Sequence, residues 1–589
     1  MKQGKRQGAA ALWLTLLMVG FSVSAVAQQA QRYWITLRDR GPHVDLSTLS
    51  AQALGISDHA LWRRAKVLPA DKLIDELDLP VNQNYLDQLR ASGITIRSMS
   101  RWFNAVSAEL TPVQQSVVSS LPFVASVGPV AVLVRREPGV IESGAPQALL
   151  KRASTADLSY GPSLTQLSNI NVVGVHSLGI NGTGVIIGML DDGFNYRTVH
   201  PALKVIKVIA DSDFVQRDGN TSIAPGEYAG QGDHGETTLS VLGGFFSGQL
   251  IGVAYGASFI LAKTEVDSSG SSDFHIEEDY YVAGLEWEER GGADVVSSSL
   301  GYNVFTVPPD YGYQDMNGRT ATTTKAARIA ASKGVLLVTA MGNEQNYQSG
   351  TKNTGTLIAP ADADSIVSVG AVYSDGTIAG FSSTGPTSDG RIKPEVVAQG
   401  VSVYVAGGTG SYHSADGTSY ATPLTAGVAA LVFSAHPTWT PMQVRNVLMQ
   451  TAKPLYNIAA GMTTRPNNFF GWGMVDALKA VQSTTADSND GHGIIPTRFV
   501  LHNNYPNPFN GSTAIIVDAP TEQEMELAIY NVLGQKVRTL YKGKSTPGVS
   551  TFYWRDGVDD ANNHVATGVY ICRLNVSGAA LSQKIVYVK

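Results

Sequence analysis

The stretch GVIIGMLDDG at residues 184–193 decides how the middle of this chain folds. Its apolar and small residues run without a break to Leu190, which is typical of a strand buried on both faces of a parallel sheet. The run ends in Asp191 and Asp192. Because ligands of open α/β sheets bind beyond the carboxyl ends of the strands, Asp191 is a candidate for chemistry. A turn held by an Asx hydrogen bond is the alternative interpretation of the same residues.

Residues 155–485 continue this alternation of short apolar runs and helical patterns, which predicts an α/β domain on a parallel sheet. A second buried run at residues 294–298 leads into small residues whose backbone edge could pair with an extended peptide. These residues are Ser299, Leu300 and Gly301. A third run at residues 334–340 leads to Gly342 and Asn343. The Asn343 amide could donate to a developing oxyanion, and Gly342 leaves that approach unobstructed.

Two polar residues stand where small-residue helices are predicted to begin. His234 is followed by Gly235, which leaves room beside the imidazole. Ser419 precedes the apolar helix predicted over residues 424–432, with Pro423 expected in its first turn. Unpaired N–H groups and the positive end of a helix would favour an oxyanion beside the Ser419 hydroxyl. Taken alone, Ser419 is better explained as an N-cap and His234 as a structural histidine.

The order Asp191, His234, Asn343 and Ser419 resembles the subtilisin-like serine proteases, or subtilases. The resemblance covers about residues 160–480 and includes the strings Gly252-Val253-Ala254, Ser299-Leu300-Gly301, Phe381-Ser382-Ser383-Thr384-Gly385-Pro386 and Gly417-Thr418-Ser419-Tyr420-Ala421-Thr422-Pro423. It implies a three-layer subtilisin-like catalytic domain and an endopeptidase that hydrolyses proteins or peptides through an acyl-enzyme.

The resemblance also implies a role for each residue of the site. Ser419 would be the nucleophile, His234 the general base and Asp191 the partner that holds the imidazole. Asn343 would line the oxyanion hole. The substrate is expected to contact Ser299, Leu300, Gly301 and Gly342.

Two positions depart from the usual pattern of the family. Asp192 stands where Thr or Ser is commoner, and Glu236 stands where Thr is usual. Neither position is expected to transfer a proton. A carboxylate at Glu236 would raise the pKa of His234, so the pH optimum stays open.

No metal or cofactor is predicted to be required. The string His234-Gly235-Glu236 lacks the His-Glu-x-x-His spacing of zinc peptidases. Structural calcium is unproven: a loop with oxygen ligands could bind one ion, but a solvated acidic loop is the preferred interpretation of the same residues. The loop contains Asp211, Asp213, Asp218 and Asn220.

The primary specificity pocket is predicted to have an apolar floor. Ile358, Ala359 and Pro360 are expected to approach it, and no charge is evident there. We therefore expect apolar side chains of the substrate to be preferred.

The composition excludes wholesale disorder and a nucleic-acid partner. Hydrophobic residues make up 43% of the chain and charged residues 16%, which supports a large core. Acidic residues outnumber basic ones by 49 to 43, without a polybasic run. Cys572 is the single cysteine, so no internal disulfide can form.

Residues 1–27 are predicted to be an export signal. A basic start precedes an apolar stretch, and Ala25-Val26-Ala27 has the small-x-small pattern of a cleavage site. A membrane anchor is the alternative. No later stretch is long and apolar enough to span a membrane, so no transmembrane segment is expected in the mature protein.

Residues 28–150 are predicted to be a small α+β unit. It has strand-like runs at 33–37, 102–108 and 123–127, and a helix that begins at Thr111 and Pro112. The resemblance implies that this unit is the propeptide, an inhibitor and folding chaperone that binds its own catalytic domain at residues 151–485. A structural domain kept in the mature enzyme is the alternative.

Beyond a polar linker at residues 486–497, residues 498–589 are predicted to form an antiparallel β-sandwich. The strings at residues 504–510, 530–535 and 568–570 resemble the C-terminal sorting domain of the type IX secretion system. This implies a bacterial outer-membrane secretion machinery as partner and a secreted or cell-surface location. A carbohydrate-binding sandwich is the alternative for this module, and an inactive adhesin is the alternative for the whole chain.

Overall fold

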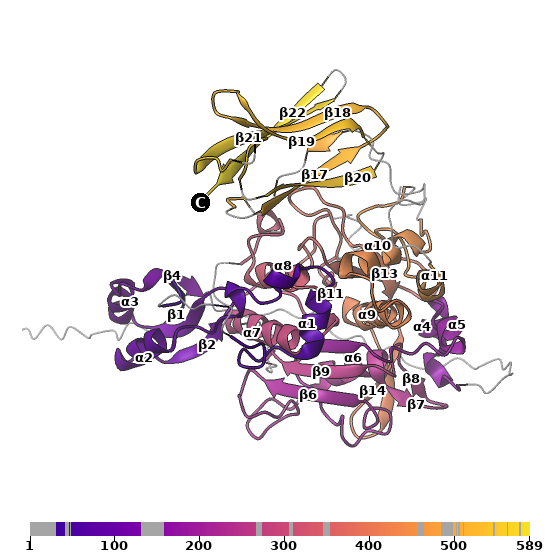
Figure 1. Cartoon of the computed structure of the whole chain (residues 1–589). Coiled ribbons are helices and arrows are strands. Elements are labelled where there is room, and N and C mark those ends of the chain that lie inside the picture. The colour runs from indigo at the N-terminus through magenta and orange to yellow at the C-terminus, as the bar shows by residue number, and fades with distance from the viewer. Residues whose placement is uncertain are drawn as a thin grey trace, which may run out of the picture.

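We describe the protein from a computed structural model of the whole chain (Figure 1). It has an N-terminal unit (residues 31–130), a central unit (158–483) and a C-terminal module (499–588). The predicted export signal and the predicted linker at residues 486–497 lie outside the described residues. The described residues are 31–41, 46, 49–130, 158–266, 274–305, 310–345, 354–456, 464–483, 499–501, 504, 507–509, 512–545, 548–555, 557–561, 563–576 and 579–588.

A seven-stranded sheet forms the middle of the central unit. Its order is β13-β12-β11-β10-β5-β9-β6, and all neighbouring pairs are parallel, as the sequence predicted. After β5 the chain forms β6 and β9 on one side and then β10 on the other, so the strand order reverses beside β5. Ligands of open α/β sheets bind at such a reversal. The strands are β5 Ile186–Asp191, β6 Lys207–Asp213, β9 Ser258–Lys263, β10 Val295–Ser298, β11 Leu336–Ala340, β12 Val367–Val372 and β13 Val396–Gln399.

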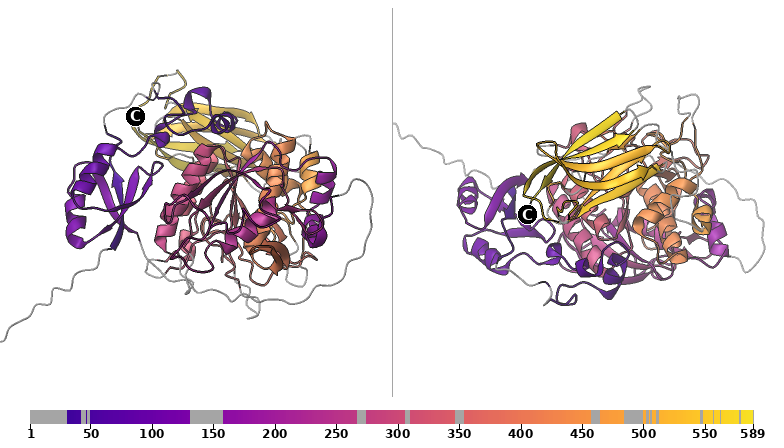
Figure 2. Two further views of the ribbon diagram at one scale, coloured as in Figure 1. Left: turned by 90° about the horizontal axis from the view of Figure 1, so that it is seen from below. Right: turned by 45° about the horizontal axis from the view of Figure 1, so that its top comes forward.

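Helices cover both faces of this sheet, so the central unit has three layers (Figures 1 and 2). The helices α6 (Asp233–Gly243) and α9 (Thr418–Ala435) share one core with Val338. The helices α7 (His275–Gly291) and α8 (Thr322–Ser332) share the other core with Leu337. Leu337 and Val338 are neighbours on β11, and their side chains point to opposite faces as strand geometry requires.

Shorter elements surround these layers. They are η4 Gly161–Ser163, α4 Leu164–Asn169, α5 Val172–Ser177, β7 Phe245–Phe246, β8 Leu250–Ile251, η5 Tyr313–Asp315, β14 Val403–Gly407, β15 Ser411–Ala415, α10 Pro441–Thr451 and α11 Ala477–Gln482. The hairpin of β14 and β15 leads directly into α9.

Helix α9 contains a proline that we expected in its first turn, and this expectation is wrong. The helix begins at Thr418, so Pro423 lies in the second turn. A proline there has no N–H to donate to the carbonyl four residues earlier, which belongs to Ser419. The Ser299 hydroxyl supplies the missing donor, since its Oγ lies 2.8 Å from the Ser419 carbonyl oxygen. This bond ties the start of α9 to the end of β10.

The N-terminal unit is a four-stranded antiparallel sheet in the order β2-β3-β1-β4 with helices on one face. Thr111 caps α3 and Pro112 is its first residue, as predicted. The strand expected at residues 102–108 begins only at Ala105, because residues 101–104 form a turn. The elements are β1 Gln31–Leu37, α1 Asp58–Arg64, η2 Ala70–Lys72, η3 Glu76–Asp78, α2 Gln83–Ala91, β2 Ile96–Ser100, β3 Ala105–Leu110, α3 Pro112–Ser119 and β4 Val124–Val130.

This unit docks on α7 of the central unit at the end of β2. The Glu286 carboxylate accepts hydrogen bonds from the Ser100 hydroxyl (2.5 Å) and from the N–H groups of Arg101 (3.0 Å) and Trp102 (3.2 Å). The Trp102 side chain is buried in the core that α7 and α8 share. One carboxylate therefore holds the turn after β2 while the indole anchors it in apolar surroundings.

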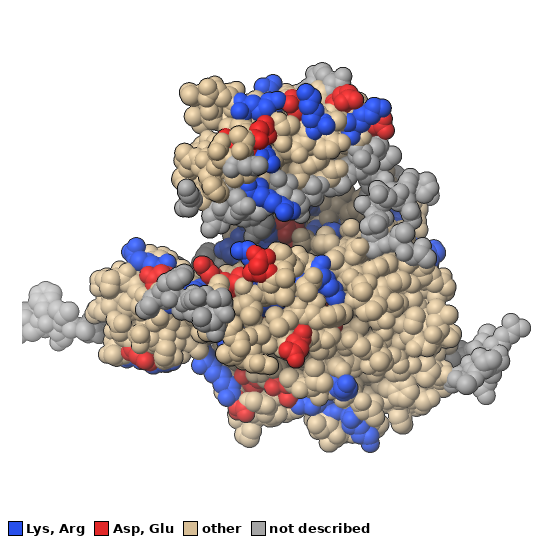
Figure 3. Space-filling view, in the orientation of Figure 1, with Lys and Arg blue, Asp and Glu red and all other residues tan. Residues whose placement is uncertain are grey.

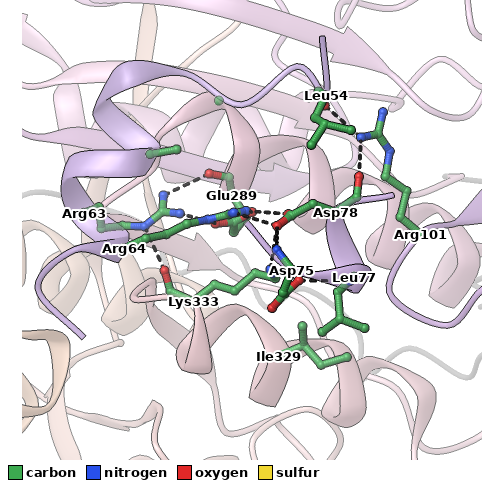
Figure 4. A network of polar contacts seen from close by, with 12 residues as sticks. Leu54, Arg63, Arg64, Asp75, Leu77, Asp78, Arg101, Glu289, Ile329 and Lys333 are labelled. Carbon is green, nitrogen blue, oxygen red and sulfur yellow. Dashed lines mark hydrogen bonds and ion pairs between the residues drawn. The ribbon is translucent and has the colours of Figure 1, made fainter. Parts of the chain in front are cut away.

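A second attachment joins α1 and η3 to the ends of α7 and α8. We call it the Arg63–Arg64 network (Figure 4). Arg64 donates to the Glu289 carboxylate and to the Asp78 carboxylate. Lys333 Nζ lies 3.2 Å from Asp78 Oδ2. Arg63 donates to the backbone carbonyls of Glu289 (3.0 Å) and Ala293 (2.7 Å). A cation near the carbonyls at a helix C-terminus is favoured by the helix dipole, so Arg63 stabilises the end of α7.

The C-terminal module consists of two antiparallel sheets that pack around Trp554 and Leu527. This confirms the predicted sandwich. In Figure 3 its visible surface carries many charged side chains, whereas the central unit shows few on the same side. No helix among the described residues is long and apolar enough to cross a membrane. The strands are β16 Val500–Leu501, β17 Ser512–Ala519, β18 Glu524–Asn531, β19 Lys536–Lys544, β20 Gly548–Arg555, β21 Gly568–Val576 and β22 Ala579–Tyr587.

Candidate active site

Asp191 ends β5 at the carboxyl edge of the sheet, beside the reversal of strand order. Its side chain is buried, and Oδ1 lies 2.7 Å from His234 Nδ1. Oδ2 accepts a hydrogen bond of 2.9 Å from the Thr238 hydroxyl. Thr238 follows His234 by four residues on α6, so both side chains lie on the same helix face. Oδ1 also accepts from the Asp192 N–H (2.9 Å). An Asx turn would use the N–H two residues on, so this bond is not the turn of the alternative interpretation.

His234 is the second residue of α6, and its side chain is 35% exposed. Because Nδ1 faces a carboxylate, it carries the proton of the neutral ring, and Nε2 is the basic nitrogen. The centroids of the His234 and Tyr420 rings are 6.1 Å apart. Tyr420 follows Ser419 in α9, so the start of α9 lies beside the imidazole.

The close approach of α6 to β5 requires glycine after His234. A Cβ at Gly235 would lie 2.0 Å from the Gly193 carbonyl oxygen and 2.9 Å from Asp191 Cβ. Gly235 was predicted to make room for the imidazole. The structure shows that the space is needed by the backbone after β5, and this close contact is what brings the carboxylate to the ring.

Asp192 caps the helix that carries His234. Its carboxylate accepts hydrogen bonds from the backbone N–H groups of Gly235 (2.7 Å), Gly232 (3.1 Å) and His234 (3.3 Å). These are orphan donors of a helix N-terminus, which a carboxylate satisfies well. These bonds favour the charged form of Asp192, but burial and the charge of Asp191 outweigh them and raise its pKa to about 8.

Glu236, the second departure from the family pattern, is fully buried on α6. Burial raises the pKa of its carboxyl to about 9. The group therefore holds its proton at neutral pH and carries no negative charge there. Our expectation that Glu236 would raise the pKa of His234 required a charged carboxylate, and near neutral pH that condition is not met.

Asn343 follows β11 at the same edge of the sheet and contacts the start of α9. Its Oδ1 accepts hydrogen bonds from the backbone N–H and the hydroxyl of Thr418, both at 3.0 Å. This fixes the amide orientation and leaves Nδ2 as the donor. The Ser383 N–H donates to the Gly342 carbonyl (3.0 Å), and the Ser383 hydroxyl accepts from the Glu344 N–H (2.9 Å). Both bonds hold the loop on either side of Asn343.

Ser419 is the second residue of α9. Its hydroxyl donates to the Ser299 carbonyl at 3.2 Å, while the Ser299 hydroxyl donates back to the Ser419 carbonyl. The nucleophile candidate and the predicted substrate-binding strand are thus in direct contact.

The remaining predicted substrate-binding residues lie on two neighbouring strand ends. The strands β10 and β11 are paired in the sheet. Ser299, Leu300 and Gly301 follow β10, and Gly342 follows β11, so the two segments leave the sheet side by side. The segment around Ala359 crosses between them, since Ala359 and Tyr302 exchange backbone hydrogen bonds of 2.8 and 3.1 Å.

Among the described residues, one cluster has the spacing of metal ligands. Asp191, Asp192 and His234 each offer an atom within 4.8 Å of the others. The same atoms bind one another and the N-terminus of α6, so this spacing is also that of an Asp–His pair. In the loop considered for calcium, Asp213 lies 3.3 Å from Lys263 Nζ and Asp211 pairs with Arg197. Calcium binding there stays a prediction.

Sequence reasoning missed Thr238 and Thr418, and it missed the structural role of Ser299, which was predicted only as a substrate contact. Thr238 could have been found from its spacing of one helical turn after His234. Thr418 and Ser299 lie within the quoted motifs, but their roles depend on contacts between segments far apart in the chain. The separation is 75 residues for Thr418 and Asn343, and 120 for Ser299 and Ser419.

Family comparisons cover all three parts of the chain. A sequence model described as the subtilase family of peptidase S8 matches residues 182–473. A model of the peptidase S8 propeptide domain of Bacteroidota matches residues 32–139. A model of the secretion system C-terminal sorting domain matches residues 503–589. The N-terminal unit is therefore a propeptide domain, and the C-terminal module is a sorting domain that indicates export.

Several characterised proteins are similar to the central part of the chain. Subtilisin E of Bacillus subtilis (strain 168) is 32% identical over 322 residues, which are 54% of this chain and 70% of subtilisin E. Subtilisin DY of Bacillus licheniformis is 33% identical over 52% of this chain and 94% of its own length. Subtilisin Savinase of Lederbergia lenta is 30% identical over 54% of this chain and 97% of its own length. With this coverage of its relatives, the chain belongs to the subtilase family and is a subtilisin-like serine endopeptidase.

Proposed function

We propose that Ser419, His234 and Asp191 form the catalytic triad of this endopeptidase. Ser419 Oγ bonds to the carbonyl carbon of the scissile peptide while His234 Nε2 takes its proton. The imidazolium then gives this proton to the leaving amine as the C–N bond breaks. Water repeats the sequence on the acyl-enzyme and releases the acid. Asp191 keeps Nδ1 protonated and stabilises the charged ring.

One observation carries this proposal. The Asp191–His234 hydrogen bond of 2.7 Å lies at the reversal point of the sheet, beside the start of the helix that bears Ser419. Three segments that are far apart in sequence meet at the carboxyl ends of the strands. They carry Asp191 as the partner of the base, His234 as the base and Ser419 as the nucleophile. A structural histidine would not need this convergence.

Asn343 is proposed as the donor to the oxyanion. Thr418 holds the oxygen side of its amide, so Nδ2 is oriented before the substrate arrives. Such preorganised donors act without reorganisation during the reaction. The Ser419 N–H, one of the free donors at the start of α9, would be the second.

The enzyme is proposed to be made as a zymogen and exported by way of its C-terminal module. The propeptide domain contacts the catalytic domain through Glu286 and the Arg63–Arg64 network, which supports an N-terminal unit that stays bound to its own catalytic domain. The sorting domain supports the bacterial outer-membrane secretion machinery as a partner and a secreted or cell-surface location.

The test uses the full-length chain and its Ser419→Ala variant. The wild-type chain should hydrolyse casein, react with a fluorophosphonate and lose mass by cleavage between the propeptide and catalytic domains. The variant should fold equally and do none of these, with kcat lower by several orders of magnitude. Retained hydrolysis in the variant would contradict the triad. No hydrolysis in the wild type would favour the inactive adhesin.

A further inference from the structure

The space between the two strand ends beside Ser419 is closed by one side chain. Segment 357–359 crosses from the end of β11 to the end of β10, since the Ile358 N–H donates to the Met341 carbonyl at 3.3 Å and Ala359 pairs with Tyr302. Ile358 therefore lies between Gly301 on one strand end and Gly342 on the other.

The Ile358 side chain reaches both of these glycines. A Cβ built at Gly301 would lie 2.4 Å from Ile358 Cδ1, and one built at Gly342 would lie 2.9 Å from the same atom. Carbon atoms do not approach within about 3 Å, so a side chain at either glycine would displace Ile358 from the position it occupies here. Ile358 itself is 8% exposed.

The direction of this side chain differs from that of its neighbours. Leu357 and Ala359 belong to a core cluster with Met341 and Met316. Strand-like residues alternate in direction, so Ile358 points away from that core and toward the two glycines. Its backbone is bonded on both sides and a β-branched side chain is stiff at χ1, so the Cγ1 atom that carries the tip keeps its direction toward the two glycines.

A bound peptide would meet this tip. The inference rests on the proposed function, in which the acyl carbon lies at Ser419 Oγ, its oxygen lies near Asn343, and the chain pairs with residues 299–301. The side chain of the residue before the scissile bond (P1) then enters between the two strand ends, where Gly301 and Gly342 form the walls.

We propose that Ile358 is a specificity-determining residue that restricts P1 to small side chains such as glycine, alanine and serine. The sequence alone predicts only an apolar floor; the geometry adds a size limit, because the Ile358 side chain reaches both glycine walls. A leucine or phenylalanine at P1 would compete with the Ile358 side chain for the same volume.

The test compares kcat/KM for peptides that differ only in P1, from alanine and serine to leucine and phenylalanine. The wild-type enzyme should prefer alanine to phenylalanine by at least about tenfold, since one methylene of misfit in such a pocket changes kcat/KM by about 10- to 200-fold. Ile358→Val, which removes Cδ1, should lower the ratio of kcat/KM for alanine to that for phenylalanine. Ile358→Ala should lower this ratio further, by at least about tenfold relative to the wild-type enzyme. Ile358→Val is the variant expected to disturb folding least.

Leu357→Ala is the matched control, because it removes a buried side chain one residue away that points into the core. It should lower stability and leave the P1 ratio unchanged. A wild-type enzyme that prefers phenylalanine, or a ratio that Ile358→Val and Ile358→Ala leave unchanged, would overturn the inference. Hydrolysis that persists in Ser419→Ala would instead refute the proposed function, so the two failures are distinguishable.

Discussion

Replacing Arg64 by alanine should weaken the attachment of the propeptide domain to the catalytic domain. The Arg64 guanidinium is fully buried and makes five hydrogen bonds, two to Glu289, two to Asp78 and one to the Leu73 carbonyl. Glu289 belongs to α7 and Asp78 to η3. The Arg64→Ala variant leaves the Glu289 and Asp78 carboxylates buried in the interface with one cation fewer than in the wild-type protein.

The magnitude follows from this burial. Removing one partner of a buried ion pair costs about 3–5 kcal/mol, because the remaining charge stays uncompensated. The deleted side chain also leaves a cavity that adds to the loss. Arg63 and Lys333 continue to face the same carboxylates, which keeps the expected loss in free energy of unfolding near about 3–5 kcal/mol.

Urea unfolding of the full-length Ser419→Ala protein measures this loss without self-cleavage. With an m value of about 3 kcal/mol/M, the midpoint of the transition that includes Trp102 should fall by about 1–1.7 M. Arg90→Ala is the matched control in the same domain, because the Arg90–Asp87 pair is about half exposed and should contribute at most about 0.5 kcal/mol. Arg64→Ala and Glu289→Ala should show a coupling of about 0.5–3 kcal/mol in a double-mutant cycle.

Equal midpoints for Arg64→Ala and Arg90→Ala would refute the reasoning. So would additive effects of Arg64→Ala and Glu289→Ala, because residues in direct contact that share a charge network are expected to couple.

Two further predictions concern the catalytic edge of the sheet. Asn343→Leu should lower kcat by about 10²–10³ with little change in KM, and a normal kcat on a peptide substrate would exclude Asn343 from the oxyanion hole. Asp192 has a folded-state pKa of about 8, above its ordinary value of 3.8, so the folded protein holds this proton more tightly and loses stability as the pH rises from about 4 to 8. Asp192→Ser in the Ser419→Ala background should therefore reduce the fall in the free energy of unfolding between pH 5 and 8, by up to about 1.4 kcal/mol per pH unit, as measured by urea unfolding. An unchanged slope would count against a protonated Asp192.

The sequence was most informative where a polar residue ends an apolar run. Asp191 and Asn343 were predicted at the ends of buried strands, and the structure puts both at the carboxyl edge of one parallel sheet. This succeeded because the apolar pattern of a strand is local, and because parallel strands bring their carboxyl ends to the same edge.

Contacts between distant segments could not be predicted in this way. Arg63 and Glu289 are 226 residues apart, and neither lies in a motif or an unusual pattern. Asp192 was noted as a departure, but its role as the cap of α6 depends on the packing of that helix against β5. Pro423 was placed one turn too early, because helix propensity alone does not reveal that the Ser299 hydroxyl can replace the missing donor.

The amino and carboxyl ends of the strands in the central sheet take part in different contacts. The helices α7 and α8 end where the strands begin, since the Asp294 N–H donates to the Ile186 carbonyl just after α7. The Arg63–Arg64 network therefore lies at the edge opposite to Asp191 and Ser419. Cutting the chain between the propeptide and catalytic domains removes a covalent link and leaves this network and Glu286 intact. With the processing proposed above, we therefore expect cleavage and release of the propeptide to be separate events, the second governed by the buried ions at the far edge.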